Sequence, residues 1–154
     1  MLVLVGKATP NDENRDVELF LGEFRRMLNE NGLFVYAWSF NPRDFAVNEL
    51  HDSLGRREDV FLYLPCDGQN SQIRLHIKDF RHFPAGTRSC PTEWLSYCIP
   101  DLQDLPWQAH TWFLIDGIED LAVPVMLLEE FEPVFPNKYV KWGQNYFAFL
   151  RGNP

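Results

Sequence analysis

The stretch of sequence that decides the fold is Asp59–Phe80, "DVFLYLPCDGQNSQIRLHIKDF". Its first part, Asp59–Pro65, is an apolar run of strand length, and the "CDGQNS" that follows is rich in turn-forming residues. After the turn, Ile73, Leu75 and Ile77 alternate with polar residues, which is the period of a strand with one solvent-facing side. The stretch therefore predicts a β-hairpin with one wet face.

Two strands and two helices are expected before this hairpin. Leu2–Gly6 ("LVLVG") is apolar enough to be a central strand. Along Arg15–Glu30, apolar residues recur every three or four positions, and the Asn-Gly that follows is a stop signal, so this range predicts an amphipathic helix. "LFVYAW" (33–38) predicts a second strand, and "PRDFAVNELHDSLG" (42–55) predicts a short helix that ends at a glycine.

The chain after the hairpin predicts fewer regular elements. Arg81–Gln108 is rich in Pro and Gly, which indicates a long loop with one helical turn around "PTEWLSYC". "HTWFLIDGIEDL" (110–121) predicts a strand that runs into a turn, "PVMLLEEF" (124–131) a short helix, and "YFAFL" (146–150) a last strand. This order predicts an α+β fold, a small mixed sheet curled into a partly open β-barrel with helices packed outside.

The length and the net charge of the chain limit the classes of function that it can have. With 154 residues the chain is expected to be one domain, 1–154. The net charge of -8 argues against a protein that coats nucleic acid through a broad basic face, although a local binding site remains compatible with this charge. Cys66, Cys90 and Cys98 lack close C-x-x-C spacing, so neither a disulfide framework nor a zinc knuckle is indicated. We expect a cytoplasmic protein without a membrane segment.

Motifs for catalysis are absent from the sequence. It carries no nucleophile elbow, zinc-protease helix, phosphate loop or dinucleotide fingerprint. His76 and His82 would share a strand face only if the strand continued past Phe80, and as metal ligands they would need partners such as Cys66 or Asp79. We therefore expect no metal, no cofactor and no catalytic residues.

Tryptophans are the stronger signal for function. Trp38 lies at a strand end, Trp94 in the long loop, and Trp107 at the exit of that loop. A planar ring that loses water on both faces gains roughly 1–3 kcal/mol per stacked base, so an aromatic cleft suits a base or a methylated group. These three are candidate ligand-binding residues, whereas Trp112, within "TWFLI", is expected in the core.

The chain resembles the PUA-like superfamily, especially its EVE and YTH branches. The likeness covers residues 33–131: "VYAWSF", then "DVFLYLP" with a turn and "IRLHIKDF", a loop with Trp, and "HTWFLIDGIEDLAVPVMLLEEF". Members of the superfamily are partly open barrels that bind RNA or DNA, and these branches flip a modified base into an aromatic cage. The resemblance implies that Trp38 is one cage wall, Ser39 a polar neighbour of the base, and Trp94 or Trp107 the second wall. It also implies that Arg74 and Lys78 face backbone phosphates.

Three function classes follow, in this order. The first is a non-catalytic domain that binds RNA or DNA and reads a modified base, working beside a nuclease or motor subunit. The second is a protein-interaction module, such as an immunity or adaptor protein, which uses exposed aromatics and which the acidic composition favours. The third, a nuclease or hydrolase on the same barrel, lacks a visible catalytic constellation.

Overall fold

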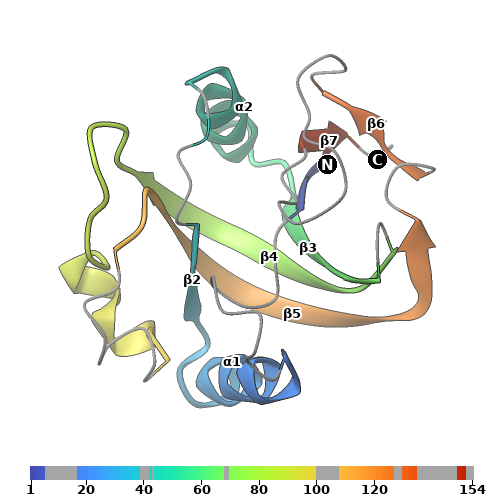
Figure 1. The fold of residues 1–154 in the computed structure, drawn as a ribbon, viewed down its shortest axis with the longest axis horizontal. Coiled ribbons are helices and arrows are strands. Elements are labelled where there is room, and N and C mark those ends of the chain that lie inside the picture. Colours follow the sequence, from blue (N-terminus) through green and yellow to red (C-terminus); the bar gives the residue numbers. More distant parts are fainter. Residues whose placement is uncertain are drawn as a thin grey trace. The chain divides into compact units, whose positions relative to one another are not determined.

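The computed structural model shows a mixed α+β fold (Figure 1). It describes residues 1–5, 17–38, 42, 44–67, 70–99, 108–126, 130–134 and 149–151. The chain divides into two compact units: unit 1 is Met1–Ala8, Phe45–His76 and Ile118–Pro154, and unit 2 is Thr9–Asp44 and Ile77–Gly117. The two longest strands, β4 (Asn70–His82) and β5 (Thr111–Met126), contribute residues to both units.

Unit 1 is built around β1 (Leu2–Val5), whose four residues are fully buried. β1 pairs in parallel with β3 (Val60–Asp67) and antiparallel with β7 (Phe149–Arg151), which in turn pairs with β6 (Glu132–Pro133). A strand with neighbours on both sides and apolar residues on both faces is a central strand. The prediction made from "LVLVG" is therefore confirmed.

The predicted hairpin is also confirmed. β3 and β4 pair antiparallel, with Phe61 opposite His76 and Leu64 opposite Ile73. The register shifts on either side of Pro65, because proline has no N–H to give to the ladder and is accommodated at an irregularity.

β5 corrects one sequence prediction. It continues as a single strand to Met126, where the sequence predicted that the strand at 110–121 would run into a turn and that a helix would begin at Pro124. Glu130 is helical, so the helix prediction is wrong for residues 124–126 and not for Glu130. In unit 1 the strand order begins at β5 and proceeds through β4, β3, β1, β7 and β6. The part of β5 that belongs to unit 1, residues 118–126, is therefore an edge strand. An edge strand tolerates proline because one side of its backbone needs no partner. Residues 127–129 lie outside the described part of the chain.

α2 (Asp44–Gly55) ends as the sequence predicted, but its stop does not use a glycine backbone. Arg57 has the left-handed φ of 60°, and its N–H donates to the carbonyl of Leu54 at 3.0 Å. The N–H of Glu58 reaches back to the carbonyl of Ser53, also at 3.0 Å. These two bonds are those of a Schellman motif with an arginine in the position that glycine usually fills.

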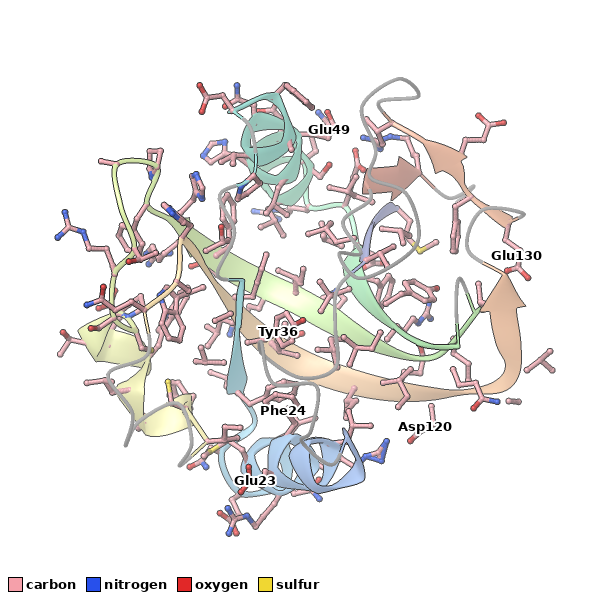
Figure 2. All side chains as sticks on the ribbon, viewed as in Figure 1. Glu23, Phe24, Tyr36, Glu49, Asp120 and Glu130 are labelled. Atoms are coloured by element: carbon pink, nitrogen blue, oxygen red, sulfur yellow. The ribbon has the colours of Figure 1, made fainter. Side chains whose placement is uncertain are left out.

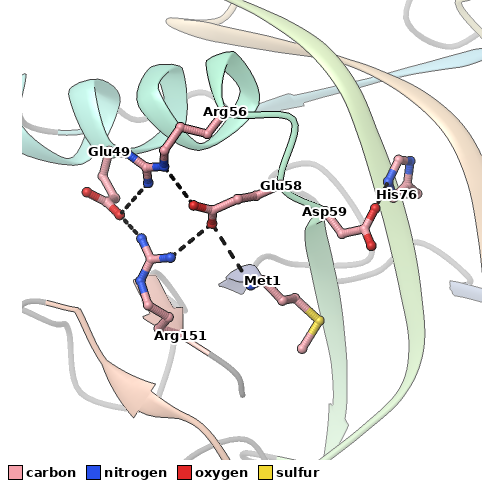
Figure 3. Close-up of polar contacts among 7 residues, drawn as sticks. All are labelled: Met1, Glu49, Arg56, Glu58, Asp59, His76 and Arg151. Carbon is pink, nitrogen blue, oxygen red and sulfur yellow. Dashed lines mark hydrogen bonds and ion pairs between the residues drawn. The ribbon is translucent and has the colours of Figure 1, made fainter. Parts of the chain in front are cut away.

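Glu58 is held by this turn inside an ion-pair network in unit 1 (Figure 3). Its carboxylate accepts from Arg56 Nε at 2.7 Å and from Arg151 Nη1 at 2.9 Å, and the amino group of Met1 lies 3.9 Å away. Arg151 also pairs with Glu49. The network joins α2, the start of β3 and the last strand of the sheet.

We expect the ion-pair network to stabilise unit 1 at neutral pH and to lose this effect in acid. The hydrogen bond from Arg56, followed by that from Arg151, holds the pKa of Glu58 below its usual range. A carboxyl whose pKa is depressed in the folded state stabilises the fold above its unfolded pKa of about 4.3, and the contribution disappears as pH falls through the folded pKa. Glu58→Gln should therefore lower the free energy of unfolding at pH 7 by at most about 1 kcal/mol, because the pair is partly solvated and screened.

Urea denaturation at pH 7 and pH 3 measures this effect. The deficit of Glu58→Gln should shrink at the lower pH and in high salt. Glu132→Gln is the matched control, since Glu132 is exposed and makes no ion pair within the described residues. An equal deficit at both pH values would contradict the assignment.

Unit 2 contains β2 (Phe34–Trp38), which pairs antiparallel with β5 so that Trp38 lies opposite Thr111. α1 (Val17–Asn31) packs on this pair through Phe24, whose ring stacks on Phe34 at 4.7 Å and meets Tyr36 edge-on at 6.4 Å (Figure 2). The N–H of Gly32, which has a left-handed φ of 77°, donates to Leu28 at 2.7 Å and ends the helix. Both predicted elements are confirmed.

The remaining segment of unit 2 is the predicted loop with a helical turn. β4 continues to His82, and the 3₁₀-helix η1 (Thr92–Tyr97) follows within the loop. The described strands form an open sheet rather than a closed barrel. Within the described part of the chain, no helix has the length and apolar character required to cross a membrane.

Candidate ligand-binding site

The predicted aromatic residues have different places in the structure. Trp38 is the last residue of β2, and its backbone pairs with Thr111. The Trp38 side chain, Ser39 and Trp107 lie outside the described part. Trp94 lies in η1 and is only 5% exposed.

Trp94 is packed against a cation rather than open to solvent. The guanidinium of Arg81 lies 4.8 Å from the centroid of its ring. Arg81 is in turn paired with Asp79 at 2.8 Å and Glu93 at 3.8 Å. Because a cation over an aromatic face is a favourable contact, a cage that used Trp94 would require Arg81 to leave the ring.

Arg74 and Lys78 were both predicted to face phosphates, and their surroundings differ. Arg74 is half-buried, with its guanidinium 4.0 Å above the Phe61 ring, paired with the Glu119 carboxylate and 3.1 Å from the hydroxyl of Tyr63. Burial acts to lower the pKa of Arg74, but the hydrogen bonds with Glu119 and Tyr63 outweigh it and raise that pKa. Lys78 is exposed and makes no ion pair within the described residues. Of the two, only Lys78 has a charge that no other described residue pairs with.

A polar pair that the sequence reading missed lies beside the end of β2. His82 Nδ1 is 2.9 Å from the hydroxyl of Thr111, the residue opposite Trp38. Thr111 is buried, and the other ring nitrogen, His82 Nε2, is buried without a hydrogen-bond partner among the described residues. Buried polar atoms are normally paired, so an unpaired one next to a candidate ligand residue is informative.

Electrostatics keep His82 neutral near pH 7. Burial, followed by the charge of the neighbouring His110, lowers the pKa of His82, and these effects outweigh the opposing charge of Asp44 and the opposing hydrogen bond with the backbone of His110. A neutral imidazole has one donor and one acceptor nitrogen, and with one nitrogen on Thr111 the other remains able to bond a ligand. His110 is held by its own contact, from Nδ1 to the carbonyl of Phe83 at 2.8 Å.

Metal binding has no support in this part of the chain. His76 pairs with Asp59 at 3.2 Å (Figure 3). His82 pairs with Thr111, so the two histidines have different partners. Among the described residues, no group of three or more His, Cys, Asp and Glu side chains is placed to hold a metal ion.

Trp112 takes the core place that the sequence predicted. It is fully buried in β5, and its indole N–H donates to the carbonyl of Arg88 at 2.9 Å. The same carbonyl accepts from the N–H of Ala109 at 2.9 Å, in a short bridge that fixes the loop to the start of β5.

Comparison with known proteins gives no relative for this arrangement: no family model matches the chain, and neither the curated proteins nor the solved structures that were searched contain a match.

Proposed function

We propose that the chain is a non-catalytic nucleic-acid-binding protein with a partly open, PUA-like barrel, and that it holds a single unstacked base at the end of β2. The observation that carries this proposal is the buried Nε2 of His82, which has no hydrogen-bond partner among the described residues and belongs to a ring that contacts Thr111, the residue opposite Trp38. A nucleobase edge carries the nitrogen and oxygen atoms that would complete the hydrogen bonding of His82. The ring of Trp38 would supply the stacking surface.

The ligand is expected to be an extruded base or a base of a single strand. In a duplex the faces of a base are stacked and its edge is paired, so neither is available to Trp38 or His82. Both RNA and DNA present such bases, and a methylated base adds apolar surface that stacks well. Binding would be centred on the base rather than on phosphates, in keeping with the net charge of -8.

Fluorescence anisotropy with single-stranded oligonucleotides, each in unmodified and base-methylated form, tests the proposal. Trp38→Ala should weaken binding by roughly 1–3 kcal/mol, about 5- to 150-fold, and leave the melting temperature near that of the wild type. His82→Ala should also weaken binding. His51→Ala is the matched control, because His51 is exposed on α2.

Two outcomes would count against the proposal. A wild-type chain that binds none of the oligonucleotides refutes nucleic-acid binding. A melting temperature that collapses in Trp38→Ala assigns Trp38 to the core, where truncation costs roughly 3–5 kcal/mol of stability.

The phosphate contribution is separable by salt. Each lysine that neutralises a phosphate adds about one unit to the slope of log affinity against log salt, so Lys78→Ala should reduce the slope by roughly one. Arg74→Ala should leave this slope unchanged and lower stability instead, since its charge is already paired with Glu119.

A protein-interaction module remains the second candidate. The acidic net charge favours it, and so does Leu95, which is exposed on η1 next to the buried Trp94. The absence of binding to every oligonucleotide would favour this class.

A further inference from the structure

Two thiols meet in the loop of unit 2, although the sequence spacing gave no reason to pair them. The sulfur atoms of Cys90 and Cys98 are 3.1 Å apart, and both cysteines are in the thiol form. Cys98 is fully buried, and Cys90 is 8% exposed. A disulfide has an S–S bond of about 2.05 Å, so closure would require a movement of only about 1 Å.

The backbone of the loop holds the thiols in this position. η1 lies between them, with the N–H of Trp94 donating to Pro91 at 2.9 Å and the N–H of Cys98 donating to Leu95 at 3.2 Å. These bonds bring residue 98 back toward residue 90. The burial of Trp94 anchors the middle of the segment. The two sulfurs are thus placed by ordered structure and not by a chance approach of two mobile ends.

The pair also has an electrostatic asymmetry. The hydrogen bond between the thiols lowers the pKa of Cys98 and raises the pKa of Cys90, and burial further raises the pKa of Cys90. When one of the two thiols has lost its proton, the remaining proton lies between the two sulfur atoms. Thiolates are the nucleophiles in thiol–disulfide exchange, and the lowered pKa of Cys98 makes its sulfur the one that gives up the first proton of the pair.

We propose that Cys90 and Cys98 are a reversible dithiol–disulfide pair, oxidised by a low-molecular-weight disulfide such as glutathione disulfide. Cys90 reacts first because it is the more accessible of the two. Cys98, whose pKa is the lower, first loses its proton to the buffer, and the proton of Cys90 then passes to the Cys98 thiolate. The Cys90 thiolate attacks one glutathione sulfur, and the S–S bond of the oxidant breaks to release one glutathione thiolate.

The second step closes the protein disulfide. The Cys98 thiol loses its proton to the released glutathione thiolate, and the Cys98 thiolate attacks the Cys90 sulfur of the mixed disulfide. The Cys90–Cys98 bond forms, and a second glutathione thiolate leaves and takes a proton from water or buffer. In balance, the two protein thiols lose two electrons and two protons, and the oxidant becomes two glutathione thiols.

The oxidised form would be more rigid around η1. The bond closes a short loop that contains Trp94, and closure of a loop removes entropy from the unfolded chain. We expect the melting temperature of the oxidised protein to rise by roughly 5 °C. Reduction with dithiothreitol should reverse the change.

The experiment equilibrates the full chain with glutathione disulfide and maps its disulfides by mass spectrometry of peptides from the alkylated protein. The wild type and Cys66→Ser should both yield a Cys90–Cys98 linked peptide and the higher melting temperature. Cys98→Ser should stop at a glutathione adduct on Cys90, because the resolving thiol is missing. Cys66→Ser excludes interference by the third cysteine.

The outcomes divide clearly. A linked Cys90–Cys98 peptide that disappears on reduction supports the proposal, and the wild type alone provides this result if a serine variant fails to fold. Free thiols at both positions after equilibration, an adduct that persists on Cys90 in the wild type, or a disulfide that includes Cys66 would overturn it. None of these readouts depends on a nucleic-acid ligand.

Discussion

Replacement of Trp112 by alanine is expected to lower the free energy of unfolding by about 3–5 kcal/mol. The Trp112 side chain is fully buried, so its truncation leaves a large cavity in the core beside β5 and removes the apolar contacts of the ring. The truncation also removes the indole donor that reaches the carbonyl of Arg88. Because native domains are stable by only about 5–15 kcal/mol, this change alone should shift the urea midpoint far below that of the wild type.

Trp112→Phe separates packing from hydrogen bonding. Phenylalanine keeps an aromatic ring but cannot donate to Arg88. The carbonyl of Arg88 still accepts from the N–H of Ala109, so it is not left without a partner. The lost bond should therefore cost about 1 kcal/mol, with a further contribution from the smaller ring. A wild-type urea midpoint in Trp112→Ala would contradict the core assignment.

Phe24→Ala should have a loss of similar size, about 3–5 kcal/mol, for a different reason. Phe24 is 1% exposed and is the residue through which α1 stacks on Phe34 and meets Tyr36. A helix of this length is marginal in water without packing of its apolar face. We therefore expect circular dichroism to show loss of helix together with loss of stability.

Two variants on the same helix serve as controls for Phe24→Ala. Phe24→Leu retains most of the apolar volume and should cost markedly less than the alanine variant. Arg26→Ala removes an exposed side chain and should change stability by no more than about 0.5 kcal/mol. If Phe24→Ala lowered the free energy of unfolding as little as Arg26→Ala in urea denaturation, this result would contradict the packing of α1 on β2 through Phe24.

Local patterns predicted the parts of the fold that depend on local interactions. The period of the apolar residues in α1 and the alternation in β4 are set by which face is buried, so both could be read directly. Pro124 misled the reading because proline is excluded from central strands but not from an edge, and a single sequence does not say which strand is at an edge. The stop of α2 was placed correctly, yet the left-handed residue is Arg57, where glycine would be expected.

The candidate site was less accessible from sequence because its contacts join distant residues. The contact between His82 and Thr111 spans 29 positions, and the pairing of Arg74 with Glu119 spans 45. Neither contact can be predicted from the spacing of neighbouring residues in the sequence. The sequence did indicate the end of β2 as a place of interest, through Trp38, but it could not show that a buried nitrogen lacks a partner there. The proximity of Cys90 and Cys98 depends on the backbone bonds of η1, which composition does not encode.

The pairing of β1 has a consequence for how the protein acquires its structure during synthesis. Leu2 lies opposite Arg151, so the antiparallel partner of β1 reaches it only after all the residues between β1 and β7 have been translated. Until then one edge of an entirely apolar strand has no permanent neighbour, and bringing such distant residues together costs entropy. We expect a nascent chain that ends before Phe149 to engage holdase chaperones or to aggregate, and a chain that includes β7 to fold slowly, because β1 and β7 are distant in sequence.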